Sequence, residues 1–228
     1  VLANTCDPEW AKGKDFSTVE KFVDYKYPFT EDNVEMGTDE YLLMEGSVKE
    51  TIRKETDLHP IDIHLTRMMA KISFKYVKAE EAKGLVVTRV LIHNMPTMMR
   101  MEETPENENY PLGDFETLAV TLDKELEPGM VYTFYMPANR RGTSTNTDPK
   151  YKNNGAPDKA LYVQLFVTSR TNGSNFLYTI YLGANDYNDF NVRRNHNYNI
   201  TLNLKSENRD DRVLAAPANC FVMNTGNE

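Results

Sequence analysis

Apolar and polar residues alternate along much of the chain between residues 61 and 204. A period of two places every second side chain on the same face, so each run predicts a strand with one buried face. The apolar positions of seven successive runs, of which the second is continuous, are Ala70, Ile72, Phe74 and Tyr76; Leu85 to Ile92; Leu118, Val120 and Leu122; Tyr132, Phe134 and Met136; Leu161, Val163, Leu165 and Val167; Phe176, Tyr178, Ile180 and Leu182; and Tyr198, Ile200, Leu202 and Leu204. The segment 57–205 therefore predicts a mainly β fold, a β-sandwich of roughly seven strands.

The alternation changes phase near the start of this segment. Ile61, Ile63 and Leu65 occupy odd positions, whereas the apolar residues beyond Met69 occupy even positions. A one-residue shift would turn every later side chain to the wrong face. The pattern predicts a strand from Ile61 onward with a bulge or break between Arg67 and Met69.

Local signals predict the elements outside these runs. Ser17 and Glu20 have the spacing of a capping box and predict a short helix over 15–25, ended by Tyr27-Pro28. Asn172-Gly173 lies between two alternating runs and predicts a hairpin. Residues 140–159 are rich in Thr, Asn, Gly and Pro and predict a long loop, of the kind that is functional or mobile.

Composition narrows the function classes. The 228 residues carry a net charge of -8, and 40% are apolar, which is typical of a globular protein rather than a disordered one. The acidic balance argues against binding to a nucleic-acid backbone. No stretch approaches the ~20 apolar residues of a membrane helix. Two cysteines, Cys6 and Cys220, are compatible with one disulfide or with two free thiols.

The ends of the sequence suggest a piece of a longer protein. The first four residues lack the basic start of a signal peptide, so we expect either a removed targeting segment or a start within a protein. Residues 220–225 have the pattern of a strand cut off before its turn. These features predict truncation at both ends.

Signals for chemistry are weak. The histidines are His59, His64, His93 and His196, and no pair has metal-binding helical spacing. No nucleophile elbow and no phosphate-binding glycine loop is present. The run Asn185–Asp189 favours a solvated turn over a calcium site. Aromatic strand residues favour a packed core, with a carbohydrate platform as the alternative. We therefore expect no catalytic residue, no cofactor and no metal, and no enzyme activity.

Four fragments in order carry a family resemblance. They are Leu65-Thr66-Arg67-Met68-Met69-Ala70-Lys71-Ile72, Tyr132-Thr133-Phe134-Tyr135-Met136-Pro137-Ala138-Asn139, Tyr178-Thr179-Ile180-Tyr181-Leu182-Gly183 and Phe190-Asn191-Val192-Arg193-Arg194-Asn195-His196-Asn197-Tyr198. Together they resemble the fimbrillin family of Bacteroidales fimbriae, including its anchor and tip relatives. Upstream, Val1–Thr5 resembles a late strand of the family's N-terminal domain, and Leu43–Gly46 resembles its exit.

The resemblance implies an antiparallel Greek-key (transthyretin-like) sandwich preceded by the end of a second β domain. The implied division is 1–56, a truncated N-terminal domain; 57–205, the C-terminal sandwich; and 206–228, a linker or lead-in to a following segment. The residues implied to define the fold are Arg67, Ala70, Lys71, Tyr135, Asn139, Tyr181, Leu182, Gly183, Arg194, Asn195 and Tyr198. Gly183 is expected to permit a turn closed to other residues, and Arg193 or Arg194 to pair with the acidic turn before it.

The implied function is structural. Family subunits assemble by donor-strand exchange at the bacterial cell surface, as lipoprotein precursors associated with the outer membrane. The partners would be other fimbrial subunits, and a host glycan or protein ligand is the further candidate. Residues 206–228 run past the usual end of a stalk subunit, which favours an accessory or tip subunit over the main stalk. The alternative is a stand-alone surface adhesin or glycan-binding module.

Overall fold

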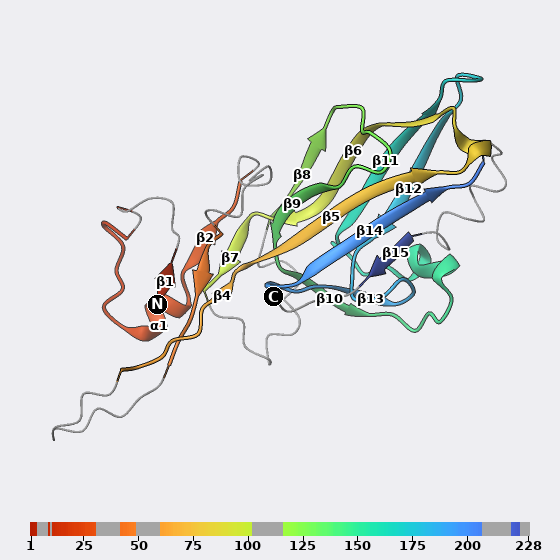
Figure 1. Ribbon diagram of the computed structural model, residues 1–228. Coiled ribbons are helices and arrows are strands. Elements are labelled where there is room, and N and C mark those ends of the chain that lie inside the picture. The colour runs from red at the N-terminus through yellow and green to blue at the C-terminus, as the bar shows by residue number, and fades with distance from the viewer. Residues whose placement is uncertain are drawn as a thin grey trace.

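Two four-stranded sheets face each other in the computed structural model, which describes residues 1–3, 9, 11–30, 42–48, 60–101, 116–206 and 220–223 (Figure 1). One sheet has the order β12-β11-β6-β8 and the other β15-β14-β5-β9. Their strands are β5 (Met69–Lys78), β6 (Leu85–Pro96), β8 (Thr117–Leu122), β9 (Tyr132–Pro137), β11 (Tyr162–Ser169), β12 (Asn175–Tyr181), β14 (Asn197–Leu204) and β15 (Cys220–Met223). The predicted mainly β sandwich is confirmed.

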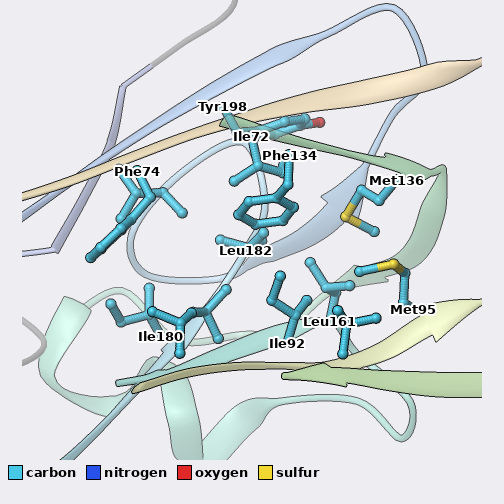
Figure 2. Close-up of a cluster of buried hydrophobic side chains, with 14 of the residues drawn as sticks. Ile72, Phe74, Ile92, Met95, Phe134, Met136, Leu161, Ile180, Leu182 and Tyr198 are labelled. Carbon is cyan, nitrogen blue, oxygen red and sulfur yellow. The ribbon is translucent and has the colours of Figure 1, made fainter. Parts of the chain in front are cut away.

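The seven alternating runs form the seven longest strands, and their apolar positions build the core. Figure 2 shows Ile72 and Phe134 of one sheet facing Ile92 and Ile180 of the other. Tyr76 and Tyr198 are the largest fully buried side chains of the described residues. Burial of one face of each strand is the driving force that the alternation predicts, at roughly 25 cal/mol per Å² of apolar surface.

One strand pair departs from the antiparallel pattern. β5 and β14 run side by side in parallel, with Lys71 opposite Asn197 and Lys78 opposite Leu204 (Figure 1). All other strand pairs among the described residues are antiparallel. The parallel pair joins the beginning and the end of the sandwich sequence. The sheet β15-β14-β5-β9 is therefore held together by pairing between strands that are distant along the chain.

Several shorter strands and helices lie outside the two four-stranded sheets. β1 (Leu2–Ala3), β3 (Met44–Glu45) and β4 (Thr66–Arg67) form a three-stranded sheet, β2 (Lys26–Pro28) pairs with β7 (Met98–Arg100), and β10 (Asn139–Thr143) pairs with β13 (Asp189–Val192). The helices are α1 (Val19–Val23), η3 (Glu80–Ala82) and η5 (Pro149–Gly155). Phe29, Leu42 and Leu43 belong to the same buried cluster as the sandwich core. The predicted domain boundaries at 57 and 206 stay predictions.

The predicted strand from Ile61 is wrong, although the predicted break is confirmed. Residues 60–65 belong to no strand, and Ile61, Ile63 and Leu65 are 37–49% exposed. The break falls at Met68, between β4 and β5, and Met68 is 2% exposed. Alternation predicted a buried face here, but no element of the described structure covers these side chains.

The predicted helix is shorter and begins later than its sequence signal. Thr18, rather than Ser17, is the N-cap, and its hydroxyl accepts a hydrogen bond from the Lys21 backbone N–H at 3.3 Å. The Asp15 carboxylate accepts from the Ser17 N–H and holds Ser17 in the turn before the helix. Val19 is exposed rather than packed. The helix ends at Val23, so Tyr27-Pro28 lies in β2 and does not terminate it.

The predicted loop over 140–159 is ordered in large part. It contains most of β10 and all of η5. Lys152 of η5 is 4% exposed, donates to the Asn185 carbonyl at 2.6 Å and lies 5.3 Å from the centre of the Phe190 ring. Ser144 N–H donates to the Asn188 carbonyl. The segment therefore packs onto the turn after β12, through side-chain contacts that a polar composition does not reveal.

The predicted C-terminal strand is confirmed over Cys220–Met223, where β15 pairs with β14. The hairpin predicted at Asn172-Gly173 joins β11 and β12 as expected, and Gly173 has φ +72°. Cys6 and Trp10 lie outside the described residues, so the pairing of Cys6 with Cys220 stays open. None of the described helices is long and apolar enough to span a membrane.

Candidate functional site

The motif residues from four distant segments meet at one end of the sandwich. This end, called the junction here, comprises the start of β5, the end of β9, the turn after β12 and the turn between β13 and β14. The Lys71 N–H donates to the His196 carbonyl, and the Asn195 N–H donates to the Met69 carbonyl. Lys71 is also opposite Tyr135 in the β5–β9 register. Lys71, Tyr135 and Asn195, which come from three of the four fragments, are therefore spatial neighbours.

Tyr198 closes the turn between β13 and β14. Its side chain is 1% exposed, and its hydroxyl accepts from the Arg193 N–H at 2.8 Å and donates to the Asn191 carbonyl at 3.1 Å. Asn195 has φ +56°, a left-handed conformation that Asn tolerates better than most residues. A buried hydroxyl and a left-handed Asn thus set the geometry with which β14 enters its sheet.

The turn from Gly183 to Asn191 is organised by two side-chain acceptors. Asn185 Oδ1 accepts from the backbone N–H groups of residues 187, 188 and 189. Asp189 is 9% exposed, and its Oδ1 accepts from the N–H groups of Ala184 and Asn191 at 2.8 and 2.9 Å. Asp189 Oδ2 accepts from Asn191 Nδ2 at 3.0 Å. These acceptors face N–H donors, which is the electrostatics of a turn and not of a cation site.

Residue 183 must be a glycine because there is no room for a side chain at this position. A Cβ built on this residue would overlap the carbonyl of Asp189, because the two backbones approach each other closely at the turn. The expectation that Gly183 permits a turn closed to other residues therefore has a steric cause in the neighbouring backbone. Leu182 beside it is fully buried, and its N–H donates to the Leu161 carbonyl.

The predicted partner of the arginines is wrong. Arg194 Nη2 lies 2.9 Å from Oε1 of Glu45 in β3, and Arg194 Nη1 donates to the Met101 carbonyl at 3.3 Å. Both side chains of the pair are mostly buried, at 11% and 15% exposed. Within the described residues neither Arg193 nor Arg194 pairs with Asp186 or Asp189. Glu45 was missed because it lies 149 residues away in the sequence.

The remaining motif residues occupy structural positions. Arg67 lies in β4 opposite Met44, and Ala70 is fully buried in β5. Asn139 is 1% exposed, and its Nδ2 donates to the carbonyls of Asn94 and Lys159. Tyr135 is buried beneath Lys71, whose Nζ lies 6.0 Å from the ring centre. Tyr181 lies on the outer face of the sheet β12-β11-β6-β8, where its ring packs edge to face against Phe190 of β13 with ring centres 5.8 Å apart.

Among the strands that the structure describes, β15 lies at the edge of its sheet and pairs with β14 alone. Its four residues pair with Asn199 to Leu202 in antiparallel register. On its other side β14 is held over eight residues by β5. An edge strand of this length is the element of a sheet most easily exchanged, because its removal leaves the rest of the sheet paired.

The described residues contain no group of three His, Cys, Asp or Glu side chains arranged to hold a metal. His64 is exposed, His93 is half-buried beside Gln164, and His196 Nδ1 lies 2.8 Å from the Arg194 carbonyl oxygen. His59 lies outside the described residues. The histidines therefore occupy separate positions and share no site.

Solved structures of bacterial surface proteins have the same architecture. The tip fimbrial protein Mfa3 from Porphyromonas gingivalis matches 83% of this chain and 68% of its own, with a TM-score of 0.51 and 17% identity. A protein described as a candidate cell-adhesion protein from Bacteroides eggerthii matches 100% and 71%, with a TM-score of 0.61 and 14% identity. The fold is that of Bacteroidales fimbrial and adhesion proteins. The expected fimbrillin-like fold is thereby confirmed.

A further structure and two sequence comparisons show how much of the chain has known relatives. A third structure, also described as a candidate cell-adhesion protein, from Parabacteroides distasonis, matches 90% of this chain and 66% of its own at a TM-score of 0.55 and 17% identity. The chain thus spans about two thirds of the length of these fimbrillin-like neighbours. A family model described as a domain of unknown function, DUF4906, matches residues 134–202. No curated protein matches the sequence.

Proposed function

We propose that this chain is part of a subunit of a bacterial cell-surface fimbria, located at the outer membrane and contributing to adhesion. The support is the shared fold with a fimbrial tip protein and with proteins described as candidate cell-adhesion proteins. The proposal includes no catalytic activity. Turnover that a single carboxylate substitution abolishes would contradict that part of it.

The observation that carries the assembly mechanism is β15. Four backbone pairs hold it to β14, and residues 207–219 connect the two strands along the chain. A neighbouring subunit's β15 can make the same main-chain hydrogen bonds to β14, since the register depends on local pairing and not on the connection. The proposed partners are therefore other fimbrial subunits, with β15 as the donated strand.

Strand donation is tested in trans. A variant that lacks residues 207–228 is mixed with a synthetic peptide of those residues, and binding and melting temperature are measured. We expect the peptide to bind and to raise the melting temperature. Val222→Pro in the peptide removes a backbone N–H from the strand and should abolish both effects, whereas Val213→Pro serves as the matched control. Equal binding of the wild-type and Val222→Pro peptides would show that β15 is not the donor.

The role within the fimbria is tested separately. Negative-stain microscopy and unboiled gel electrophoresis of the full-length precursor, before and after limited trypsin, distinguish stalk from terminal subunits. We expect the cleaved protein to remain monomeric, as an accessory or tip subunit should. Filaments or a stable ladder after cleavage would assign it to the stalk.

A further inference from the structure

The outer face of β6, β11 and β12 carries a compact grid of side chains that the core does not use. Core positions such as Val90, Leu165 and Ile180 point inward, so the alternate residues face outward. Strand register places them in three rows, called here the outer grid: Arg89, Phe166 and Leu177; Leu91, Gln164 and Thr179; and His93, Tyr162 and Tyr181. Strand and residue spacings give a surface of about 10 by 14 Å, enough for a short oligosaccharide.

Arg89 is the charged group of the first row. Its guanidinium carbon lies 4.0 Å from the centre of the Phe166 ring, within the range of a cation–π contact. No carboxylate of the described residues pairs with it. None of the strands β6, β8, β11 and β12 contains Asp or Glu, although the chain has 34 acidic residues. An arginine beside an aromatic ring, on strands that contain no acidic residue, is placed to bind a planar anion through parallel N–H groups.

The third row is aromatic. His93 stacks on Tyr162 with ring centres 4.4 Å apart and an interplanar angle of 17°, and Tyr162 contacts Tyr181 at 5.1 Å. His93 Nε2 lies 2.9 Å from Gln164 Oε1, which fixes the imidazole. Within the described part of the chain the hydroxyls of Tyr162 and Tyr181 have no hydrogen-bond partner. Burial, with a smaller contribution from Tyr162, raises the pKa of Tyr181, so its hydroxyl remains a donor at neutral pH.

We propose that the outer grid is a binding site for an acidic saccharide, with the carboxylate or sulfate group on Arg89 and the sugar rings across Leu177, Gln164 and the tyrosine row. Sugar rings offer apolar C–H faces and hydroxyl groups together, and the grid pairs apolar and aromatic surface with the hydroxyl groups of Tyr162 and Tyr181. The site names a ligand class for the adhesive role and in this sense rests on the proposed function.

A second copy of the chain fits this face poorly. In a two-fold pairing the same patch meets itself, so Arg89 would be buried against strands that contain no acidic residue. A charge buried without a partner is strongly unfavourable. The absence of acidic strand residues therefore favours an anionic ligand over self-association.

Titration calorimetry and chemical-shift mapping on the whole chain test the site. The probes are 3′-sialyllactose, trigalacturonic acid and a heparin tetrasaccharide, with lactose as the neutral comparison. We expect at least one acidic probe to bind at least tenfold more tightly than lactose, with an affinity that falls as salt increases. The carboxylated and sulfated probes separate the two sources of negative charge.

Matched variants locate the binding. Arg89→Gln and Leu177→Glu, the latter at a side chain that is 52% exposed, should each weaken the acidic probe at least tenfold. Lys75→Gln removes a positive charge from β5 in the other sheet, and Val131→Glu adds a negative charge at another exposed apolar residue, so both should bind as wild type. Absence of binding to every acidic probe would overturn the proposal. It would also be overturned if the site variants Arg89→Gln and Leu177→Glu changed the affinity no more than the controls Lys75→Gln and Val131→Glu. Strand donation is measured in a different experiment, the binding of the 207–228 peptide to the deletion variant. A negative result for saccharide binding therefore does not contradict strand donation, and the reverse also holds.

Discussion

Arg194, in the turn between β13 and β14, forms an ion pair with Glu45 of β3 across 149 positions of sequence. The pair connects the three-stranded sheet at the N-terminal side to the turn that leads into β14. Asn195 and His196, the next two residues, hydrogen-bond the backbone at the start of β5. The turn therefore links three separate parts of the fold, and its position depends on the charge pair as well as on backbone pairing.

Breaking this pair should destabilise the protein. Exposed ion pairs contribute about 0–1 kcal/mol, and loss of one partner of a fully buried pair costs about 3–5 kcal/mol. With 11% and 15% side-chain exposure the Arg194→Ala substitution should cost about 2 kcal/mol in the free energy of unfolding, measured by urea titration. Arg193→Ala is the control and should cost less. A double-mutant cycle with Glu45→Gln should show coupling; additive effects would mean that the contact does not stabilise the fold.

Gly183→Ala should be strongly destabilising. The new methyl group would overlap the Asp189 carbonyl, so the turn must shift, at a cost of about 3 kcal/mol. Gly173→Ala is the matched control, since its φ is +72° but nothing lies within 4 Å of a Cβ there. That variant should cost only about 1 kcal/mol, from backbone strain. Similar melting temperatures for the two variants would show that the close approach at Gly183 relaxes without cost.

Most of the sandwich was predictable from alternation, because seven runs bury one face each in a single core. The same signal failed at Ile61, Ile63 and Leu65, where alternation is present but no described element covers the side chains. Periodicity records which face a sequence is able to bury and does not record whether a partner surface exists. The parallel pairing of β5 with β14 also lay beyond sequence, since it depends on the crossover of the chain.

The candidate sites were harder to predict because they depend on contacts distant in sequence. Family resemblance identified Arg194 and Gly183, but the sequence neighbourhood suggested the wrong partner for the arginine. The outer grid was visible only as aromatic and polar residues on strands, for which core packing was the better interpretation. Strand register is what separates Tyr162 and Tyr181, on the outer face, from Tyr178, in the core.

Calcium should not stabilise the turn after β12. Asn185 Oδ1 and both oxygens of Asp189 already accept hydrogen bonds from N–H groups that point at them. A cation in the same place would face these positive dipoles. We expect the same melting temperature in millimolar calcium and in a chelator. Asp189→Asn should lower the melting temperature in both solutions, and a calcium-dependent rise in the wild type would contradict this interpretation.

Tyr76 should make the fold sensitive to alkaline pH. Its side chain is fully buried, its hydroxyl donates to the Leu126 carbonyl at 2.8 Å, and burial raises the pKa of the phenol. The unfolded chain releases this proton near pH 10, whereas the folded chain keeps it to higher pH. Between these values the folded state binds more protons, so the free energy of unfolding falls as pH rises; the stabilisation is complete below pH 10.

Tyr76→Phe should cost about 1 kcal/mol at neutral pH through the lost hydrogen bond and should flatten the decline above pH 10. Denaturant titrations at several pH values measure both effects, with the exposed Tyr187→Phe as control. A decline of equal slope in wild type and Tyr76→Phe would assign the alkaline sensitivity to other groups.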